Sequence, residues 1–318
     1  MNPTTGTVPH WTQRYRRPRS LLALLVCLAP LAGAAPAAAA PDCSPKPAVR
    51  VLASGQGTLE SIASDRRGRL FYTDVDAQRL LRLDRPGAQP TVLAENMDSI
   101  LGVMVDTDGS LVVGFGNSNT DALADNGNAG LMRVDPKTGK TLAIITRGLD
   151  MANGIARGPD GAYYASNDFG SGIDRFLNGV VTDNWAQVET PNGLVIDSAG
   201  RYLYAAQTFR PASIAQIDLA HPELATTYVA ASGADMFAGP DGITRDGADR
   251  LYVAANGAGE VWRVDRDRTI CALTRNLPFV SSVSFGGAKP GFPGRNLYAV
   301  TFTGLVVELA NVTDQPPA

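Results

Sequence analysis

The apolar residues of this chain fall into short runs that are separated by polar turns. The runs at residues 69–73 and 251–254 are examples, and turn pairs such as Asp108-Gly109 and Asp160-Gly161 precede others. Short apolar runs bounded by turns are typical of β-strands, and runs that are apolar throughout indicate strands packed on both faces. No amphipathic helix of 12 or more residues is expected, so the pattern predicts an all-β protein.

A three-residue motif recurs six times, each time ahead of a strand-like run. Its first positions are Glu60, Leu101, Asn153, Asn192, Asp241 and Ser281, at spacings of 41, 52, 39, 49 and 40 residues. A second apolar landmark, for example at residues 80–84 and 261–265, ends 24 residues after the first position in units one, three and five. A period of about 40–50 residues with several strands per unit indicates a β-propeller. We therefore predict six blades of four strands each.

The ends of the repeat predict how the ring closes. The sixth unit stops after its third strand near residue 310, while residues 49–53 precede the first motif without a partner. We expect this N-terminal strand to close the last blade against residues 306–309, which removes an unpaired edge. The predicted propeller domain covers residues 41–318, with a core at about 46–310. A polar loop at residues 117–129 is either a functional lid or an inert surface insertion.

Residues 1–40 differ from the rest of the chain. Arginines 14, 16, 17 and 19 precede an apolar run at 21–31, and an alanine-rich stretch follows at 34–40. This order is typical of a cleavable secretory signal peptide, and the apolar run is short for a membrane span. An uncleaved anchor is the alternative. We expect a secreted or periplasmic protein whose mature chain makes no stable membrane insertion.

Two cysteines, Cys43 and Cys271, remain after the predicted signal peptide. Cys271 lies in the expected outer strand of blade five, and Cys43 comes just before the outer strand of blade six. A disulfide between them is expected in an exported chain, with two separate thiols as the alternative. The mature chain has 24 basic and 31 acidic residues, a net charge of −7, which argues against nucleic acid as a partner.

Oxygen-bearing side chains occupy four of the six first positions: Glu60, Asn153, Asn192 and Asp241. Equivalent positions in a propeller converge near one end of the central channel, so these side chains should meet. Two carboxylates and two amides are ligands for a hard divalent cation, and calcium is the expected one. Asn-Gly and Asp-Gly pairs also occur in turns, but Glu60 is not a turn residue.

The second strand of each blade returns to the same end of the channel. Polar residues near the ends of these strands are candidates for the wall of a substrate pocket, and some are expected to be ordinary rim residues. The candidates are Asp74, Asn117, Asn167, Asp168, Gln207 and Asn256.

The segments around Glu60 and at residues 191–194, 240–243 and 282–287 carry a resemblance that extends over about residues 46–310. They resemble the senescence-marker-protein (regucalcin), gluconolactonase and luciferin-regenerating-enzyme family of six-bladed propellers. The resemblance implies that Glu60, Asn192 and Asp241 bind a divalent cation. It implies that Asn153 either joins them or holds substrate, and that Asp241 is also the general base.

The function that follows is a secreted, metal-dependent lactonase-type hydrolase, similar to gluconolactonase. A cation-activated water would attack the carbonyl of a small lactone or ester. Met151 stands where family members that hydrolyse sugar lactones often carry an arginine, which argues against an aldonolactone substrate.

Two alternatives remain: a non-catalytic propeller that binds a ligand or partner, and a strictosidine-synthase-like enzyme. The latter needs a late-blade glutamate, for which Glu260 and Glu308 are poorly matched. Serine-type catalysis is disfavoured because the chain has no G-x-S-x-G motif.

Overall fold

The structure is a computed structural model that describes residues 39–317, except 119, 121, 122, 124, 125, 210, 288 and 289. The predicted signal peptide therefore lies almost wholly outside the described residues, as do five residues of the loop predicted at 117–129. No helix within the described ranges is both long and apolar enough to cross a membrane.

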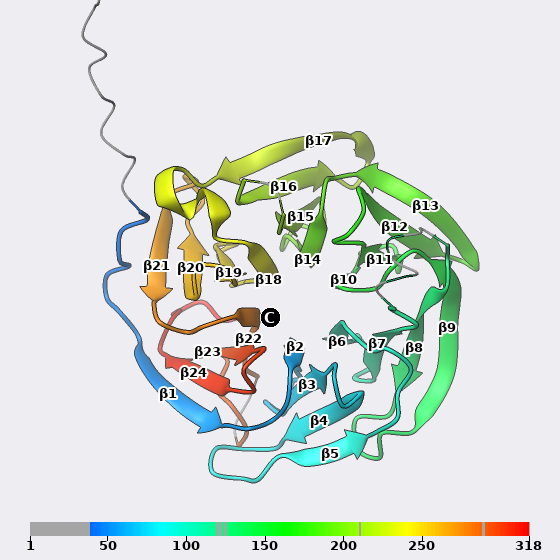
Figure 1. Cartoon of the computed structure of the whole chain (residues 1–318), viewed down its shortest axis with the longest axis horizontal. Helices are drawn as coiled ribbons and strands as arrows, with labels where there is room; N and C mark the ends of the chain where they lie inside the picture. Colours follow the sequence, from blue (N-terminus) through cyan, green and yellow to red (C-terminus); the bar gives the residue numbers. More distant parts are fainter. Residues whose placement is uncertain are drawn as a thin grey trace, which may run out of the picture. The chain divides into compact units, whose positions relative to one another are not determined.

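The strands form six four-stranded antiparallel sheets, which surround a central channel as the blades of a propeller (Figure 1). The predicted all-β, six-bladed architecture is confirmed. Blades one to three consist of β2 (Leu59–Ser64), β3 (Leu70–Asp74), β4 (Arg79–Leu83) and β5 (Thr91–Ala94); β6 (Val103–Val105), β7 (Leu111–Phe115), β8 (Ala129–Val134) and β9 (Thr141–Leu149); and β10 (Ile155–Arg157), β11 (Tyr163–Ser166), β12 (Gly172–Leu177) and β13 (Val180–Gln187).

Blades four to six follow the same order from the channel outward. They consist of β14 (Pro191–Ile196), β15 (Tyr202–Gln207), β16 (Ser213–Asp218) and β17 (His221–Ala230); β18 (Pro240–Arg245), β19 (Leu251–Ala255), β20 (Glu260–Val264) and β21 (Ile270–Thr274); and β22 (Val280–Phe285), β23 (Leu297–Thr301), β24 (Val306–Ala310) and β1 (Ala48–Ala53). A short 3-10 helix, η1 (Gly233–Phe237), lies between β17 and β18.

The last blade is completed by the N-terminal strand, as predicted. β1 pairs antiparallel with β24, and Val49 and Val51 lie opposite Leu309 and Val307. In Figure 1 the blue β1 lies alongside the red β24. This pairing joins the two ends of the described chain in one sheet, so β24 is left without an open edge.

A disulfide holds the segment ahead of β1 against blade five. Cys43 and Cys271 are bonded, with their Cα atoms 5.0 Å apart, which confirms the predicted pair. The Cys43 N–H donates to the Ala272 carbonyl at 2.8 Å, and the Ala272 N–H donates to the Pro41 carbonyl at the same distance. The N-terminal segment thus adds backbone hydrogen bonds to β21 beside the covalent link.

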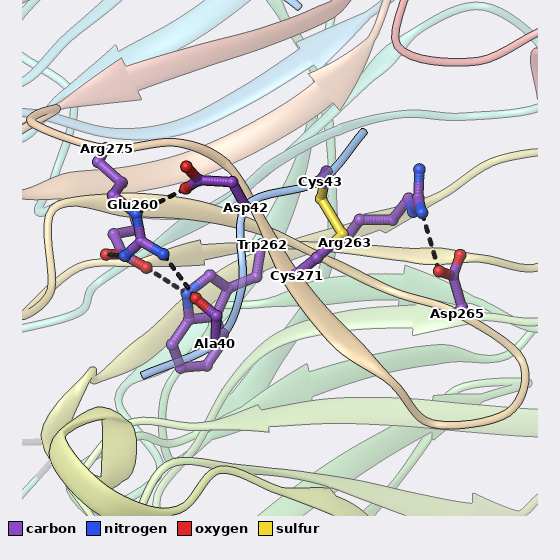
Figure 2. Close-up of a disulfide and its surroundings, with 9 residues drawn as sticks. All are labelled: Ala40, Asp42, Cys43, Glu260, Trp262, Arg263, Asp265, Cys271 and Arg275. Carbon is purple, nitrogen blue, oxygen red and sulfur yellow. Dashed lines mark hydrogen bonds and ion pairs between the residues drawn. A yellow bond between two sulfur atoms is a disulfide. The ribbon is translucent and has the colours of Figure 1, made fainter. Parts of the chain in front are cut away.

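Polar contacts around the disulfide reinforce this attachment (Figure 2). Arg275 donates from Nε to Asp42 at 2.9 Å and from Nη2 to the Ala40 carbonyl at 2.6 Å. Arg275 also pairs with the buried Glu260, whose second oxygen accepts the Trp262 indole N–H at 2.8 Å. One arginine therefore joins the N-terminal segment to blade five.

The hydrophobic core lies between neighbouring blades. Leu59 and Tyr72 of blade one, for example, share one buried cluster with Tyr298 and Val306 of blade six. Because each blade packs on the next, the innermost strands are held rigidly around the channel, where the predicted site lies.

Candidate metal centre

The glycine of the repeated motif sets how closely the innermost strands approach. A Cβ atom on Gly154 would lie 2.1 Å from the carbonyl oxygen of Asn192 in the next blade. Cβ atoms on Gly102, Gly193 and Gly242 would come within 2.1, 2.6 and 2.5 Å of atoms of the next blade. Only glycine fits at such separations, so the motif reflects close packing around the channel, which brings the first-position residues side by side.

Side-chain hydroxyls bind neighbouring blades to one another around the channel. Ser166 donates from Oγ to the Asn192 carbonyl at 2.5 Å and accepts from the Gly154 N–H at 2.8 Å. Hydroxyls that likewise bond to a carbonyl of the next blade belong to Thr73, Thr208 and Ser281. In four blades, the backbone at or just before the first position is therefore held by the preceding blade.

One cavity of about 70 Å³ is lined by Glu60, Asn153, Asn192 and Asp241 together. Glu60, Asn192 and Asp241 lie on β2, β14 and β18, and Asn153 lies in the turn before β10. All four side chains are buried. A space of this size holds an ion with a few waters. The four predicted ligands are thus brought to one place, at the end of the channel where the innermost strands begin.

Burial and mutual repulsion dominate the electrostatics of this cavity. Burial raises the pKa of Glu60 to about 8, and the charge of Asp168 adds to the shift, while a hydrogen bond from Asn153 opposes it. The pKa of Asp241 is raised well above its usual range by burial and then by the charges of Glu60 and Asp168. Burial also raises the pKa of Asp168 to about 6.

Asp168 follows β11 and is a third carboxylate in this group. Its Oδ1 is buried without a hydrogen-bond partner, and the Asn153 side chain lowers the pKa of both Asp168 and Glu60. In the described part of the chain, no lysine, arginine or histidine forms an ion pair with Glu60, Asp168 or Asp241. Buried carboxylates without a paired cation, one of them with an orphaned oxygen, are the ligand type that a hard divalent cation prefers, although the oxygens of these three do not all lie within 4.8 Å of one another.

Asn256, another predicted pocket residue, contacts the same group. It follows β19 and donates from Nδ2 to Asp241 Oδ2 at 3.2 Å. From the sequence, Asp168 and Asn256 were predicted only as residues of the pocket wall. The repeated motif marks the start of the innermost strands and contains no residue that follows a second strand. Their positions in the turns after β11 and β19 were the available signal.

The side chains of the other predicted pocket residues form hydrogen bonds or ion pairs with neighbouring residues of the protein. The fully buried Asp74 forms an ion pair with Arg79 at 2.5 Å and accepts the Thr58 and Ala77 N–H groups at 3.2 Å. Asp74 therefore stabilises the turns of blade one.

Asn117 positions the neighbouring ligand segment. It donates to the Ser99 carbonyl at 3.0 Å, and its Oδ1 accepts the Ala152 N–H at 2.7 Å, directly before Asn153. It thereby ties blade two to the turn that carries Asn153.

Gln207 and Asn167 also bond to nearby groups. Gln207 donates to the Glu189 carbonyl at 2.9 Å and accepts from Ser213 Oγ at 3.0 Å. The Asn167 Oδ1 accepts the Phe169 N–H at 3.1 Å. Both residues shape the loops beside the cavity.

A second acidic group lies away from the channel. Asp150, Asp174 and Asp183 bring ligand oxygens within 4.8 Å of one another between the outer strands of blades two and three. They are the only such trio of acidic, histidine or cysteine side chains among the described residues, so the channel carboxylates spread more widely. The two Asp174 oxygens accept the Asp150 and Asn184 N–H groups at 2.9 Å, and burial raises its pKa to about 6. Backbone amides thus satisfy the central carboxylate of this trio.

Comparison with known proteins tests the predicted family resemblance. Residues 175–300 match the sequence model of the SMP-30/Gluconolactonase/LRE-like region. The predicted family resemblance is confirmed. No curated protein matches the sequence of this SMP-30/gluconolactonase-like chain.

Solved structures share its fold. A gluconolactonase from Xanthomonas campestris is 18% identical with a TM-score of 0.68, over 87% of this chain and 99% of that one. A calcium-binding protein, regucalcin, from Agrobacterium tumefaciens is 19% identical with a TM-score of 0.65, over 85% and 97%. An aldose sugar dehydrogenase from Streptomyces coelicolor is 18% identical with a TM-score of 0.61, over 83% and 98%. At these identities the likeness is one of fold.

Proposed function

We propose that this protein is an exported, metal-dependent lactonase-type hydrolase whose active site is the channel cavity. An SMP-30/gluconolactonase-like propeller fits a lactonase-like function. The observation that carries the finer proposal is the group of three buried carboxylates that no cation of the described residues pairs with, together with the orphaned Asp168 Oδ1. A structural disulfide is consistent with export to the periplasm or the medium.

Glu60, Asn153, Asn192, Asp168 and Asp241 are the residues that would hold the cation. Their oxygens suit calcium, and one fold relative is named as a calcium-binding protein. When bound, such a cation polarises a carbonyl and lowers the pKa of water. The protein must then place the lactone carbonyl at the cavity and remove a proton from the attacking water.

Asp241 is suited to take that proton. Without a cation, burial and the neighbouring carboxylates raise its pKa, and a bound cation would oppose this shift, so Asp241 can act as the base only while it is not fully engaged as a ligand. The hydrogen bond from Asn256 to Oδ2 orients the carboxylate. We therefore assign Asp241 two roles, as a ligand and as the general base.

The alternative functions have less support. A propeller fold also serves a dehydrogenase, so the fold alone decides nothing about chemistry. Glu260 and Glu308, which a strictosidine-synthase-like mechanism would need, lie on the third strands of their blades. Glu260 pairs with Arg275, and Glu308 pairs with Arg50 at 2.7 Å.

Two substitutions that each remove one negative charge distinguish the two proposed roles of Asp241, ligand and general base. Glu60→Gln should weaken calcium binding, so excess calcium should restore much of its lactone hydrolysis. Asp241→Asn removes both a ligand and the base, so its activity should stay low at any calcium concentration. Asp183→Asn removes an exposed acid from the peripheral trio and is the matched control. Wild-type turnover in both channel variants would refute the catalytic assignment and favour a binding propeller.

A further inference from the structure

Four exposed phenylalanines occur in loops beside the candidate site. Phe169 and Phe209 are 39% and 61% exposed, and Phe237 and Phe279 are 78% and 56% exposed. Each lies at the end of the blades where the innermost strands begin, in the connection after a second strand or before an innermost strand. We call these four residues the aromatic rim.

Phe169 and Phe209 join two neighbouring blades. Their rings stack with centroids 5.9 Å apart and an interplanar angle of 22°. Phe169 directly follows Asp168, whose carboxylate belongs to the cavity group. The Phe209 N–H donates to Thr190 Oγ1 at 3.2 Å, two residues before the ligand Asn192. The stacked pair is therefore attached beside two site residues, to Asp168 through the chain and to the segment of Asn192 through Thr190.

Phe237 is the last residue of η1 and Phe279 lies in a loop, and both precede the next two innermost strands. The loop after Phe237 accepts hydrogen bonds from the Asn256 and Gly257 N–H groups at 3.0 and 2.8 Å, beside the Asn256 side chain that holds Asp241. Phe279 lies two residues before Ser281, which lines the cavity.

The backbone of Phe279 is strained. Its φ is +54°, a left-handed conformation that bulky side chains rarely adopt, although glycine would adopt it readily. A positive φ recurs at the equivalent position of other blades, two residues before the first motif residue: Ser99 (+44°), Thr190 (+49°) and Gly239 (+59°). The conformation therefore belongs to the repeated turn, and blade six places an exposed aromatic ring at it.

Among the described residues, several polar side chains beside the cavity are already hydrogen-bonded within the protein and are therefore not free to recognise a sugar. Asp74, Asn117 and Gln207 use their side-chain atoms on the protein's own turns. Met151, two residues before Asn153, is buried and apolar. Since the cavity itself is about 70 Å³, the rest of a substrate must lie outside it, against the loops that carry the aromatic rim.

We propose that the aromatic rim binds the apolar part of the substrate, so that the preferred substrate is a lactone with an alkyl or aryl substituent rather than a polyhydroxylated sugar lactone. This inference rests on the proposed function. Its physical basis is the transfer of hydrocarbon from water onto exposed rings, which are apolar and lose little conformational entropy.

A homologous series of lactones tests the inference. For the calcium-loaded protein, we expect kcat/KM to rise from γ-butyrolactone to γ-octalactone and γ-decalactone, by up to about fourfold per methylene that becomes buried. Glucono-δ-lactone should be a poorer substrate than γ-decalactone. A flat series, or a preference for glucono-δ-lactone, would overturn the inference while the hydrolase proposal stands.

Substitutions locate the effect. Phe209→Ala should lower kcat/KM for γ-decalactone about tenfold more than for γ-butyrolactone, and Phe279→Ala should act in the same direction. Leu224→Ala is the matched control, because this exposed residue lies on the outer strand β17. An equal loss on both lactones, or no loss on either, would contradict a role for the rim in binding apolar substrate.

Binding of the lactam counterpart of γ-decalactone separates this inference from the proposed function. Tighter binding than for the unsubstituted lactam, lost in Phe209→Ala, would support the rim even if no lactone were hydrolysed. In that case the hydrolase proposal alone would fail. Equal binding of the two lactams would overturn the inference, whatever the hydrolytic activity.

Discussion

Replacing Glu60 with glutamine should change the stability of the protein in opposite directions with and without calcium. Without a cation, the Glu60 charge is penalised by burial and by Asp168, so that its pKa is about 8 in the folded protein instead of 4.5. The folded state then holds this proton more tightly than the unfolded state. Stability of the metal-free protein should therefore fall as the pH rises from about 4.5 to about 8, and the full penalty is present above that range.

The size of the effect follows from the same two pKa values. At pH 8 the penalty is on the order of 4 kcal/mol, because each unit of pKa difference corresponds to about 1.4 kcal/mol. Glutamine keeps the shape of Glu60 and removes the charge. The metal-free variant should melt higher than the wild type at pH 8, by roughly 8 °C at about 2 °C per kcal/mol. At pH 5, where Glu60 already holds its proton, the two should melt alike.

Saturating calcium at pH 8 should reverse the order, because the variant loses a charged ligand. Thermal melts followed by circular dichroism, at both pH values and with or without calcium, measure all of these differences. Glu95→Gln removes a charge from an exposed glutamate and is the control. Equal melting temperatures of the metal-free proteins at pH 8 would refute the claim that the buried Glu60 charge destabilises the fold. Equal stabilisation of both proteins by calcium would refute Glu60 as a ligand.

Three further predictions concern the closure and the inner strands. The Cys43→Ser/Cys271→Ser variant should lose up to about 5 kcal/mol in urea unfolding, because the bond closes a loop with a sequence separation of 228; an unchanged midpoint would contradict this. Deleting residues 41–53 should lower the melting temperature markedly, since β24 loses its partner strand and Glu308 loses Arg50, and an unaltered melt would count against the closure. Gly154→Ala should weaken calcium binding at least tenfold in calorimetry, because its Cβ would lie 2.1 Å from the Asn192 carbonyl; wild-type affinity would show that the inner strands can move apart.

The fold could be predicted because the repeat imposes a regular order on the chain. The six recurring motifs indicated the number of blades. The last unit lacks a fourth strand, and residues 49–53 were the one strand-like segment without a place in a blade. Once Cys43 and Cys271 were assigned to the outer strands of adjacent blades, their pairing followed. In the structure these inferences correspond to β1 beside β24 and to the Cys43–Cys271 bond.

The site was only partly accessible from sequence. The motif brings Glu60, Asn153, Asn192 and Asp241 into register, so their meeting at one cavity could be predicted. The place of Asp168 depends on the turn after β11 and on a side-chain bond to Asn153, which the repeat does not determine. Likewise, the sequence does not reveal that the side chains of Asp74 and Asn117 accept hydrogen bonds from the backbone of neighbouring turns.

Calcium-dependent hydrolysis is the direct test of the proposed function. The purified protein should be freed of metal with a chelator, shown by metal analysis to be cation-free, and assayed on γ-decalactone while calcium is added back. We predict that hydrolysis is lost on chelation and returns with about one equivalent of bound calcium, in the wild type and in Asp183→Asn but not in Asp241→Asn. Undiminished turnover by the cation-free protein would contradict a metal-dependent lactonase.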